Sequence, residues 1–423
     1  MRTPLAAAAR RRGRPRVVVV GAGFAGLAVV EGLRRQPVRV TLVDRHTYHT
    51  FQPLLYQVAT GGLNPGDIAF PARALVRRGR RTAFRQGELT GVDWEHRRIE
   101  LADGGVIPYD YLVLAFGATT NYFGVPGAAE HSRPIYTLDD ALAVRNQMVR
   151  GLEHAAAFGA ATGELTAVIV GGGATGIEMA GTLAELGATT LRRDYPQLDR
   201  ARARVVLVEQ RDHLLTAFPA RLRRYALAAL VRRGVEVRLR ESVGAVGPEH
   251  VVLGSGEVIP AGLVLWAAGV GVDALAARLG LVQGPGGRLV VEPDLRASGH
   301  AEVFIAGDLA AAGGPGGTLL PQLAQPAIQA GRHVAHQIRS LAAGDVTRPF
   351  HYRGRGIMAT IGRRAAVAEL AGGLQLSGTL AWAAWLGLHL VTLLGVRNRL
   401  SVLLNWAWHY VTWRGGARVI VGG

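Results

Sequence analysis

The sequence contains no cysteine and no lysine. The absence of cysteine excludes structural disulfides, iron–sulfur clusters, zinc–thiolate sites and every dithiol redox mechanism. All 48 basic residues are arginine, so Schiff-base catalysis and pyridoxal phosphate chemistry are excluded as well. His46, His49, His213 and His389 do not form a metal-ligand spacing with carboxylates, so we read them as ordinary histidines and expect no metal.

Acidic residues are few relative to basic ones, and the formal net charge is +17. Such a balance points to nucleic acid or to an anionic membrane surface as a partner. No nucleic-acid-binding signature accompanies the charge, so we favour the membrane and expect no nucleic acid. Residues 1–15 form a basic arm, which we expect to be disordered because of its composition. The arm resembles the start of a signal peptide, but Pro4–Ala9 is too short for the apolar segment that a signal peptide needs.

The length of 423 residues fits two or three domains, and 49% hydrophobic residues suffice for sizeable cores. The first nucleotide-binding pattern begins with the β-branched run Val17–Val20, which predicts a buried parallel strand. The glycine turn 21–26 follows, then a predicted helix over Leu27–Arg35 and a strand over Val38–Val43 that ends at Asp44. This order is typical of a dinucleotide-binding unit.

Each position in this unit has a physical reason. Gly21 permits the tight turn, Gly23 lets the backbone approach a pyrophosphate, and Gly26 allows close packing of helix on strand. The helix N-terminus directs its partial positive charge at the phosphates. Asp44, which lies 23 residues after Gly21, can accept hydrogen bonds from ribose hydroxyls.

The same pattern recurs later in the chain. Ala167–Val170 predicts a strand, residues 171–176 form a second glycine turn, Ile177–Leu186 reads as a helix, and Arg204–Val208 predicts a strand closed by Glu209. The acid lies 38 residues after Gly171, more than the usual ~20. The surplus sits in a polar, arginine-rich insertion over 187–203. Two such units predict two dinucleotides, FAD in one and a nicotinamide in the other, unless one site of a duplicated fold is empty.

At this point the chain resembles the type II NADH dehydrogenases, the non-pumping NADH:quinone oxidoreductases of the pyridine nucleotide-disulfide oxidoreductase-like flavoproteins. The most specific matching segments are Phe51–Gly61, Ala324–Gln329, Met358–Gly362 and Trp382–Arg418. Tyr111–Ala118 and its repeat Leu263–Gly269 resemble the segments that join the two nucleotide domains, and Val303–Asp308 resembles the late FAD motif.

The resemblance implies roles for individual residues. Glu178 matches a glutamate near the nicotinamide, although its position alone equally suits a charge that complements the helix dipole. Gln325 and Gln329 share one helix face, which the resemblance places at the flavin and the quinone head, although Gln329 can also be read as part of a polar helix face. Arg355 is carried over only as a basic residue that relatives share.

The residues expected to act in catalysis are Glu178, Gln325 and Gln329. Those expected to bind the cofactors are Gly21, Gly23, Phe24, Ala25, Gly26, Asp44, Arg45, Ala115, Gly117, Gly307, Asp308, Gly171, Gly173, Ala174, Thr175, Gly176, Glu209 and Gly269.

The C-terminal segment lacks acidic residues after Glu369 and carries four arginines. Residues 370–396 are uncharged and long enough to span a bilayer, but glycines interrupt them. In the next stretch Leu400, Leu403, Leu404, Ala407, Trp408 and Val411 form an amphipathic stripe. Trp406, Tyr410 and Trp413 suit a membrane interface. A spanning helix, a monotopic foot and a dimer interface compete, and we favour the foot.

The expected fold is α/β, with two Rossmann-like dinucleotide-binding domains, the NAD domain inserted in the FAD domain, and a C-terminal amphipathic helical membrane foot. We expect FAD at 16–123 and 293–375, NADH at 124–292, and the foot at 376–423. The resemblance implies non-covalent FAD, NADH as substrate and a membrane quinone as acceptor. It also implies a peripheral enzyme on the cytoplasmic face of the bacterial inner membrane, and a homodimer is left open.

Two rival functions remain at this point. One is a soluble NAD(P)H-dependent flavin reductase of a ferredoxin or rubredoxin, against which the C-terminal segment argues. The other is a non-catalytic nicotinamide sensor that docks to membranes.

Overall fold

A computed structural model describes residues 14–77, 79, 81–412 and 420. The predicted basic arm, Trp413, Arg414 and Arg418 lie outside these residues, except for positions 14 and 15 of the arm, and so do the side chains of Tyr410 and Val411. The chain divides into two compact units. Unit 1 comprises Met1–His49, Phe70–Thr119 and Val270–Arg353, and unit 2 comprises Thr50–Ala69, Thr120–Gly269 and Gly354–Gly423.

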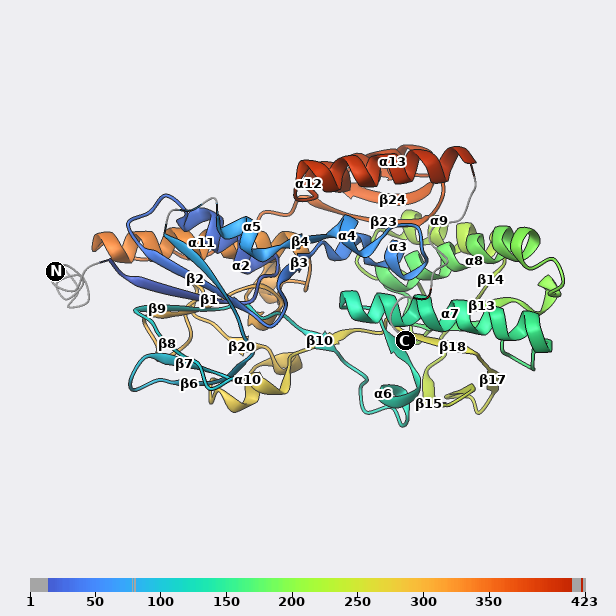
Figure 1. Ribbon diagram of the computed structural model, residues 1–423, viewed down its shortest axis with the longest axis horizontal. Helices are drawn as coiled ribbons and strands as arrows, with labels where there is room; N and C mark the ends of the chain where they lie inside the picture. The colour runs from blue at the N-terminus through green and yellow to red at the C-terminus, as the bar shows by residue number, and fades with distance from the viewer. Residues whose placement is uncertain (1–13, 78, 80, 413–419, 421–423) are drawn as a thin grey trace. The chain divides into compact units, whose positions relative to one another are not determined.

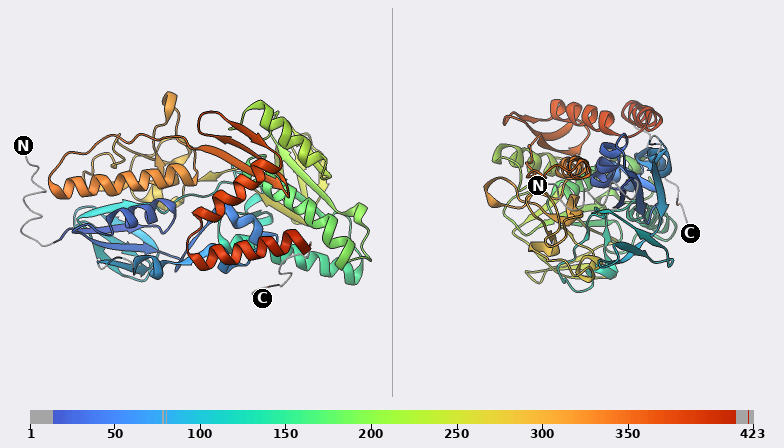
Figure 2. Two further views of the ribbon diagram at one scale, coloured as in Figure 1. Left: turned by 90° about the horizontal axis from the view of Figure 1, so that it is seen from above. Right: turned by 90° about the vertical axis from the view of Figure 1, so that its left-hand side faces the viewer.

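Unit 1 is built on a five-stranded parallel sheet with the order β21-β9-β1-β2-β5 (Figure 1). Its strands are β21 (Val303–Ile305), β9 (Tyr111–Leu114), β1 (Arg16–Val20), β2 (Arg39–Asp44) and β5 (Thr82–Gln86). Strands β1 and β9 are almost wholly buried, as expected for apolar runs covered on both faces. Helix α2 (Phe24–Leu33) packs against the long helix α11 (Ala324–Ala343) (Figure 2).

Close helix packing in unit 1 depends on small residues. A Cβ on Gly331 of α11 would lie 2.2 Å from the carbonyl oxygen of Ala25 on α2. The smaller elements of this unit are α5 (Ala72–Val76), the antiparallel strands β6 (Leu89–Asp93), β7 (Arg98–Leu101) and β8 (Val106–Pro108), α10 (Ala274–Arg278), and the paired strands β20 (Leu289–Val290) and β22 (Ala310–Ala311).

Unit 2 repeats the design with a second parallel sheet of order β11-β18-β12-β13-β14. Its strands are β11 (Arg133–Pro134), β18 (Leu263–Trp266), β12 (Thr166–Val170), β13 (Arg204–Glu209) and β14 (Val235–Leu239). The main helices are α7 (Leu138–Phe158), α8 (Ala174–Asp194) and α9 (Ala220–Val231), with α3 (Leu55–Ala59), α4 (Pro65–Ile68) and α6 (Ala128–His131) as short ones. An antiparallel group is formed by β15 (Val243–Gly247), β16 (His250–Leu253) and β17 (Val258–Pro260).

The C-terminal part of unit 2 forms a small antiparallel sheet followed by two helices. It consists of the antiparallel strands β23 (Gly356–Gly362), β24 (Ala365–Leu370) and β25 (Gln375–Ser377), followed by α12 (Thr379–Thr392) and α13 (Val396–Thr412). Helix α12 packs on β24, and α8 and α9 contact the same small sheet (Figure 1). Short strands β3 (Tyr48–Thr50), β4 (Ala69–Pro71), β10 (Thr119–Thr120) and β19 (Val270–Gly271) lie where the chain passes between the units.

Three elements differ from the sequence predictions. Both predicted helices begin three residues early, at Phe24 and Ala174, because Gly23 and Gly173 act as N-caps. Helix α8 continues to Asp194, so the first eight positions of the predicted insertion 187–203 extend a helix. The uncharged stretch 370–396 divides into β25 and α12, and among the described residues no helix is long and apolar enough to cross a membrane.

Candidate functional site

The first glycine turn joins β1 to α2 in unit 1. Gly21 has φ +108°, and a Cβ there would lie 2.2 Å from the carbonyl oxygen of Ala115, so only glycine fits. A Cβ on Gly26 would lie 1.8 Å from the carbonyl oxygen of Gly21, which explains how closely α2 approaches the turn. Gly23, the N-cap of α2, has no atom within 4 Å of such a Cβ. The turn therefore leaves an open approach to the helix N-terminus.

Asp44 holds this turn from the end of β2. The backbone N–H of Ala22 donates to its Oδ2 at 2.6 Å, and the N–H of His46 donates to its Oδ1 at 2.7 Å. Arg45 follows directly, and its carbonyl oxygen accepts from the side-chain amide of Gln86. Phe24 and Ala25 form the first turn of α2. Asp44 thus orients the backbone next to the place expected for a pyrophosphate.

Other predicted residues of unit 1 gather at the carboxyl ends of neighbouring strands. Ala115 and Gly117 follow β9, and Gly307 and Asp308 follow β21, which pairs with β9. Gly307 has φ +75° and lies next to α2, since a Cβ there would be 3.1 Å from Cβ of Ala25. Parallel strands bring their carboxyl ends to one edge, which is where ligands bind in such sheets.

Arg288 is a buried cation that the sequence analysis did not single out. Its guanidinium donates to the carbonyl oxygens of Leu320, at 2.8 Å, and of Ala310. Burial lowers the pKa of Arg288, and the charge of Asp308 acts in the opposite direction. Both residues line a small pocket with Pro326 and Phe350. No sequence pattern marks Arg288, because its partners are main-chain carbonyls brought together only by folding.

Gln325 and Gln329 lie in the first two turns of α11, which begins at Ala324. The side chain of Gln329 pairs with the backbone of Arg353. Its Nε2 donates to the carbonyl oxygen of Arg353 at 2.9 Å, and its Oε1 accepts from the N–H of Arg353 at 3.1 Å. This pairing supports the structural interpretation of Gln329. The expected roles of both glutamines in catalysis stay predictions.

The second glycine turn, between β12 and α8, reproduces the first in detail. Gly171 also has φ +108°, and a Cβ on it would lie 2.5 Å from the carbonyl oxygen of Ala267. A Cβ on Gly176 would lie 1.9 Å from the carbonyl oxygen of Gly171, and Gly173 is again an N-cap with open space. The N–H of Gly172 donates to Oε2 of Glu209 at 2.7 Å.

Three further residues predicted to bind a cofactor lie close to this second turn. Ala174 and Thr175 form the first turn of α8. Gly269 has φ +158°, and its carbonyl oxygen accepts from the N–H of Asn121 at 3.2 Å. The long spacing between Gly171 and Glu209 does not disturb the site, because the extra residues extend α8 at its far end.

Helix α8 carries Glu178, Gly181 and Glu185 along the face that meets the hairpin of β23 and β24. Oε1 of Glu178 accepts from the N–H of Thr360 over a long 3.4 Å. Burial raises the pKa of Glu178 to about 8, and the contact with Thr360 only partly opposes this shift. Glu178 is therefore largely protonated at neutral pH and able to donate a hydrogen bond.

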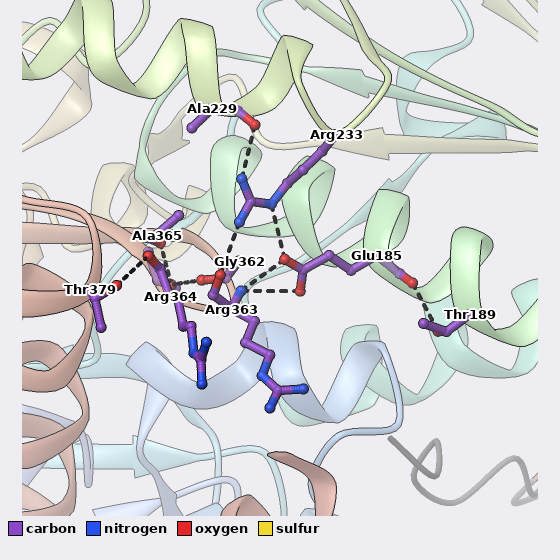
Figure 3. A network of polar contacts seen from close by, with 10 residues as sticks. Glu185, Thr189, Ala229, Arg233, Gly362, Arg363, Arg364, Ala365 and Thr379 are labelled. Atoms are coloured by element: carbon purple, nitrogen blue, oxygen red, sulfur yellow. Dashed lines mark hydrogen bonds and ion pairs between the residues drawn. The ribbon is translucent and has the colours of Figure 1, made fainter. Parts of the chain in front are cut away.

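Farther along α8, Glu185 acts with Arg233 of the segment after α9 to hold the backbone of Arg363 in the hairpin from both sides (Figure 3). The N–H of Arg363 donates to Glu185 at 2.8 Å, and the carbonyl oxygen of Arg363 accepts from Nη2 of Arg233 at 3.0 Å. Nε of Arg233 closes the arrangement by donating to Glu185 at 2.9 Å. These hydrogen bonds therefore fix the position of the hairpin along α8.

The segment Phe51–Gly61 lies in unit 2 and is bound to the C-terminal helices. The indole N–H of Trp406 on α13 donates to Oε1 of Gln57 at 2.7 Å, and the Gln57 amide donates to the hydroxyl of Tyr56 at 2.8 Å. Both Gln57 and Trp406 are buried. The expectation that Trp406 lies at a membrane interface is therefore wrong, because its ring is buried between Gln57 and Trp385 of α12.

The histidines take different places, and the described part of the chain contains no cluster able to hold a metal ion. His213 is paired with Asp212, and His46 lies 3.6 Å from Asp44. His389 is partly buried, stacks on Trp385 and contacts the Trp385 carbonyl oxygen at 2.7 Å. His49 is buried against the first glycine turn.

Two family profiles match the chain. The pyridine nucleotide-disulphide oxidoreductase family matches residues 15–331, and the NDH2 C-terminal domain matches residues 355–415. The type II NADH:quinone oxidoreductase NdhA of Mycobacterium tuberculosis is 37% identical, covering 96% of this chain and 88% of that protein. The demethylphylloquinone reductase NdbB of a Synechocystis species is 31% identical, covering 93% and 96%.

Solved structures agree on the fold. The structure of NDH2 from Plasmodium falciparum in complex with NADH has a TM-score of 0.89 at 19% identity and covers 96% of this chain and 100% of that one. The sulfide:quinone oxidoreductase of Aquifex aeolicus has a TM-score of 0.73 at 18% identity and covers 94% and 95%. The predicted α/β architecture with Rossmann-like units is thus confirmed.

Proposed function

Because the chain belongs to the type II NADH:quinone oxidoreductases, we propose how its own residues support electron transfer from NADH to a membrane quinone. The enzyme is a FAD-dependent oxidoreductase, as the whole pyridine nucleotide-disulphide family is. The observation that carries the proposal is the repeat of one acid-held glycine turn in each unit, at Asp44 and at Glu209. Two such turns give one chain room for two dinucleotides.

The first turn fits the FAD pyrophosphate. The Gly23 position is open, the N-terminus of α2 points its N–H groups there, and Asp44 stands beside it at the end of β2. When bound, FAD supplies the two-electron redox chemistry that a chain without cysteine lacks. The domain borders predicted at 123, 292 and 375 remain our proposal for the cofactor domains. The compact units divide differently. Residues 50–69, 120–123 and 354–375, predicted for the FAD domain, cluster with unit 2, and residues 270–292, predicted for the NADH domain, cluster with unit 1.

We assign NADH to the second turn. Glu209 ends β13 where the adenosine ribose of a nicotinamide dinucleotide lies in such folds. A carboxylate there accepts hydrogen bonds from a 2′-hydroxyl and repels a 2′-phosphate, so NADH is preferred over NADPH. Glu178 is a protonated carboxyl on the helix that starts at this turn, and we propose that it orients the nicotinamide carboxamide. Gln325 is proposed to face the flavin and the quinone head.

The C-terminal helices support a membrane-facing role through an inverted distribution of polarity. Asn398, Ser401 and Asn405 of α13 face inward and bond with the 64–69 segment, as the side chains of Ser401 and Asn405 donate to Asp67 at 2.6 and 2.9 Å. The outward side is apolar: Leu400, Leu404 and Trp408 are 55%, 68% and 59% exposed, together with Leu403. A surface helix of a soluble protein usually shows the opposite arrangement.

We therefore propose that this face rests in a bilayer surface, as a monotopic foot. In a bacterium the enzyme then lies on the cytoplasmic face of the inner membrane. The competing hypothesis is that a second copy of the chain covers this apolar face in a homodimer. The foot also argues against a soluble reductase of ferredoxin or rubredoxin.

Vesicle flotation tests the foot. The double variant Leu400→Glu/Leu404→Glu should leave vesicles that contain anionic lipid, whereas Val346→Glu, at an 81% exposed apolar position in unit 1, should bind as the unaltered protein does. Binding by the double variant would contradict the foot. A change of oligomeric state in detergent, without loss of vesicle binding, would identify the face as a dimer contact.

The function itself is tested by the visible spectrum of the purified protein. NADH should bleach the flavin absorbance, and a quinone analogue should then restore it. Bleaching that only a ferredoxin or rubredoxin reverses would favour the soluble reductase. No bleaching at all would favour a nicotinamide sensor.

A further inference from the structure

His49 contacts two residues of the first glycine turn. The residue is only 3% exposed, and its Nδ1 lies 2.8 Å from the carbonyl oxygen of Ala22. Its ring also meets the ring of Phe24 edge-on, with centroids 5.1 Å apart and planes at 83°. Ala22 and Phe24 both belong to the turn between β1 and α2, so one side chain contacts the turn at two points.

The donor and the acceptor of this hydrogen bond follow from the chemistry of the two groups. A carbonyl oxygen is only an acceptor, so Nδ1 must carry the proton and donate. Burial lowers the pKa of His49 to about 4, which keeps the ring neutral near pH 7. Ala22 is itself 2% exposed, so without this donor its carbonyl oxygen would be a buried acceptor.

This carbonyl matters because of the peptide to which it belongs. The C=O of Ala22 and the N–H of Gly23 form one planar trans unit, in which the two groups point in opposite directions. Fixing the carbonyl toward His49 therefore aims the Gly23 N–H toward the open side of the turn. The preceding peptide is fixed as well, because the N–H of Ala22 donates to Asp44 at 2.6 Å.

The second glycine turn provides an independent comparison within the same chain. Gly172 occupies the position that Ala22 has in the first turn, and its N–H is held by Glu209 at 2.7 Å. Its carbonyl oxygen is held too, by the backbone N–H of Leu215 at 2.9 Å. Both turns thus fix the same two peptides. The first turn uses an imidazole where the second uses the main chain.

We propose that His49 is a positioning residue for FAD, which holds the Ala22–Gly23 peptide so that the Gly23 N–H is aimed at the pyrophosphate. The inference builds on the assignment of FAD to the first turn. His49 acts through the turn and does not touch the reacting atoms. It follows that its loss should weaken FAD binding while the nicotinamide site, whose carbonyl is held by the main chain, is unaffected.

Three substitutions separate the hydrogen bond from packing. Asn places its amide nitrogen one bond beyond Cγ, as Nδ1 is in histidine, whereas Gln places it one atom farther out and Leu offers no donor. His49→Leu and His49→Gln should weaken FAD binding roughly five- to tenfold, the effect of losing one hydrogen bond. His49→Asn should restore most of the affinity. His336→Leu, at an exposed histidine on α11 of the same unit, is the matched control.

The measurement is the dissociation constant of FAD, from the change in flavin fluorescence when FAD is added to stripped protein. NADH binding to the same samples, followed separately, reports whether unit 2 is intact. The expected order of affinity is wild type and His336→Leu, then His49→Asn, then His49→Gln and His49→Leu, with NADH binding constant.

Three results would overturn the proposal. Equal FAD affinity in all variants would show that the Ala22 carbonyl needs no side-chain donor, while the assignment of FAD to this turn would stand. Equal weakening in the Asn, Gln and Leu variants would assign His49 to packing alone. If FAD binds as before to a protein whose Gly23 is replaced by Val, the first turn is not the FAD site, and the proposal falls together with that assignment.

Discussion

Gly181 offers a direct test of how the C-terminal hairpin is held on α8. A Cβ at this position would lie 1.7 Å from the carbonyl oxygen of Ile361 in β23, and 2.7 Å from its carbonyl carbon. Both neighbours are backbone atoms, so no side chain can move aside. In Gly181→Ala the helix and the strand must separate by more than an ångström, and the hydrogen bonds on either side of the contact, from Thr360 to Glu178 and from Arg363 to Glu185, must lengthen.

The same helix contains a matched control. Gly187 lies six positions along α8, and a Cβ there meets no atom within 4 Å. Gly187→Ala should gain the usual helix propensity of ~1 kcal/mol. Gly181→Ala gains the same amount but is overpacked, which typically costs about 1–3 kcal/mol and more where backbone must move. Gly187→Ala should therefore stabilise the protein, and Gly181→Ala should be less stable than it by ~1–3 kcal/mol.

Urea unfolding, followed by tryptophan fluorescence, measures the difference in stability between the two variants. Hydrogen exchange adds a local readout. The amides of Thr360 and Arg363 should exchange faster in Gly181→Ala than in the unaltered protein, and at an unchanged rate in Gly187→Ala. The reasoning is refuted if Gly181→Ala is as stable as Gly187→Ala and its strand amides remain protected. Such a result would mean that α8 and β23 do not pack as closely as the 1.7 Å approach requires.

Four further predictions follow from the site. The pKa of Glu178 is raised from 4.5 to about 8, so between these pH values the folded protein keeps a proton that the unfolded chain releases. The free energy of unfolding should therefore fall as the pH rises from 4.5 to about 8. Glu178→Gln should flatten this pH dependence, as measured by urea unfolding in the absence of NADH. Glu209→Gln removes the charge expected near the ribose and should narrow the preference in kcat/KM for NADH over NADPH, whereas equal use of both by the wild type would contradict the assignment. Gln325→Ala should slow flavin reoxidation by quinone more than flavin reduction by NADH in stopped-flow measurements, and an unaltered reoxidation would make Gln325 structural. Asp67→Ala removes the acceptor of two α13 side chains, Asn405 among them, and should hasten proteolysis of α13 by several-fold while the rate of flavin bleaching by NADH is unchanged.

The two glycine turns could be read from sequence because each is a local device. A glycine is needed where φ is +108°, and each of these glycines comes directly after a strand predicted from a run of apolar, mostly β-branched residues. The acid that ends the next strand is found by its position after an apolar run, even when the spacing is long, as for Glu209. These features depend on backbone sterics over a few tens of residues, so the pattern of residue types was sufficient.

The distant contacts could not be predicted in this way. The hold of Glu185 and Arg233 on Arg363 joins residues 178 and 130 positions apart. The sequence predicted which face of α13 is apolar, but only the fold shows that this face points outward, because three polar side chains on the other face bond with the 64–69 segment. From the sequence, Gln329 could also belong to a polar helix face. Only the structure shows that its side-chain amide bonds with the backbone N–H and C=O of Arg353.

The sequence alone therefore determined the chemistry that is excluded, the two dinucleotide turns and the family. Tertiary structure decided which side chains hold those turns and helices in place, such as His49 behind Ala22 and Trp406 against Gln57. The physical reason is that a turn is specified by the conformations its own residues allow, whereas a buried polar side chain is specified by whichever partner folding brings within hydrogen-bond distance.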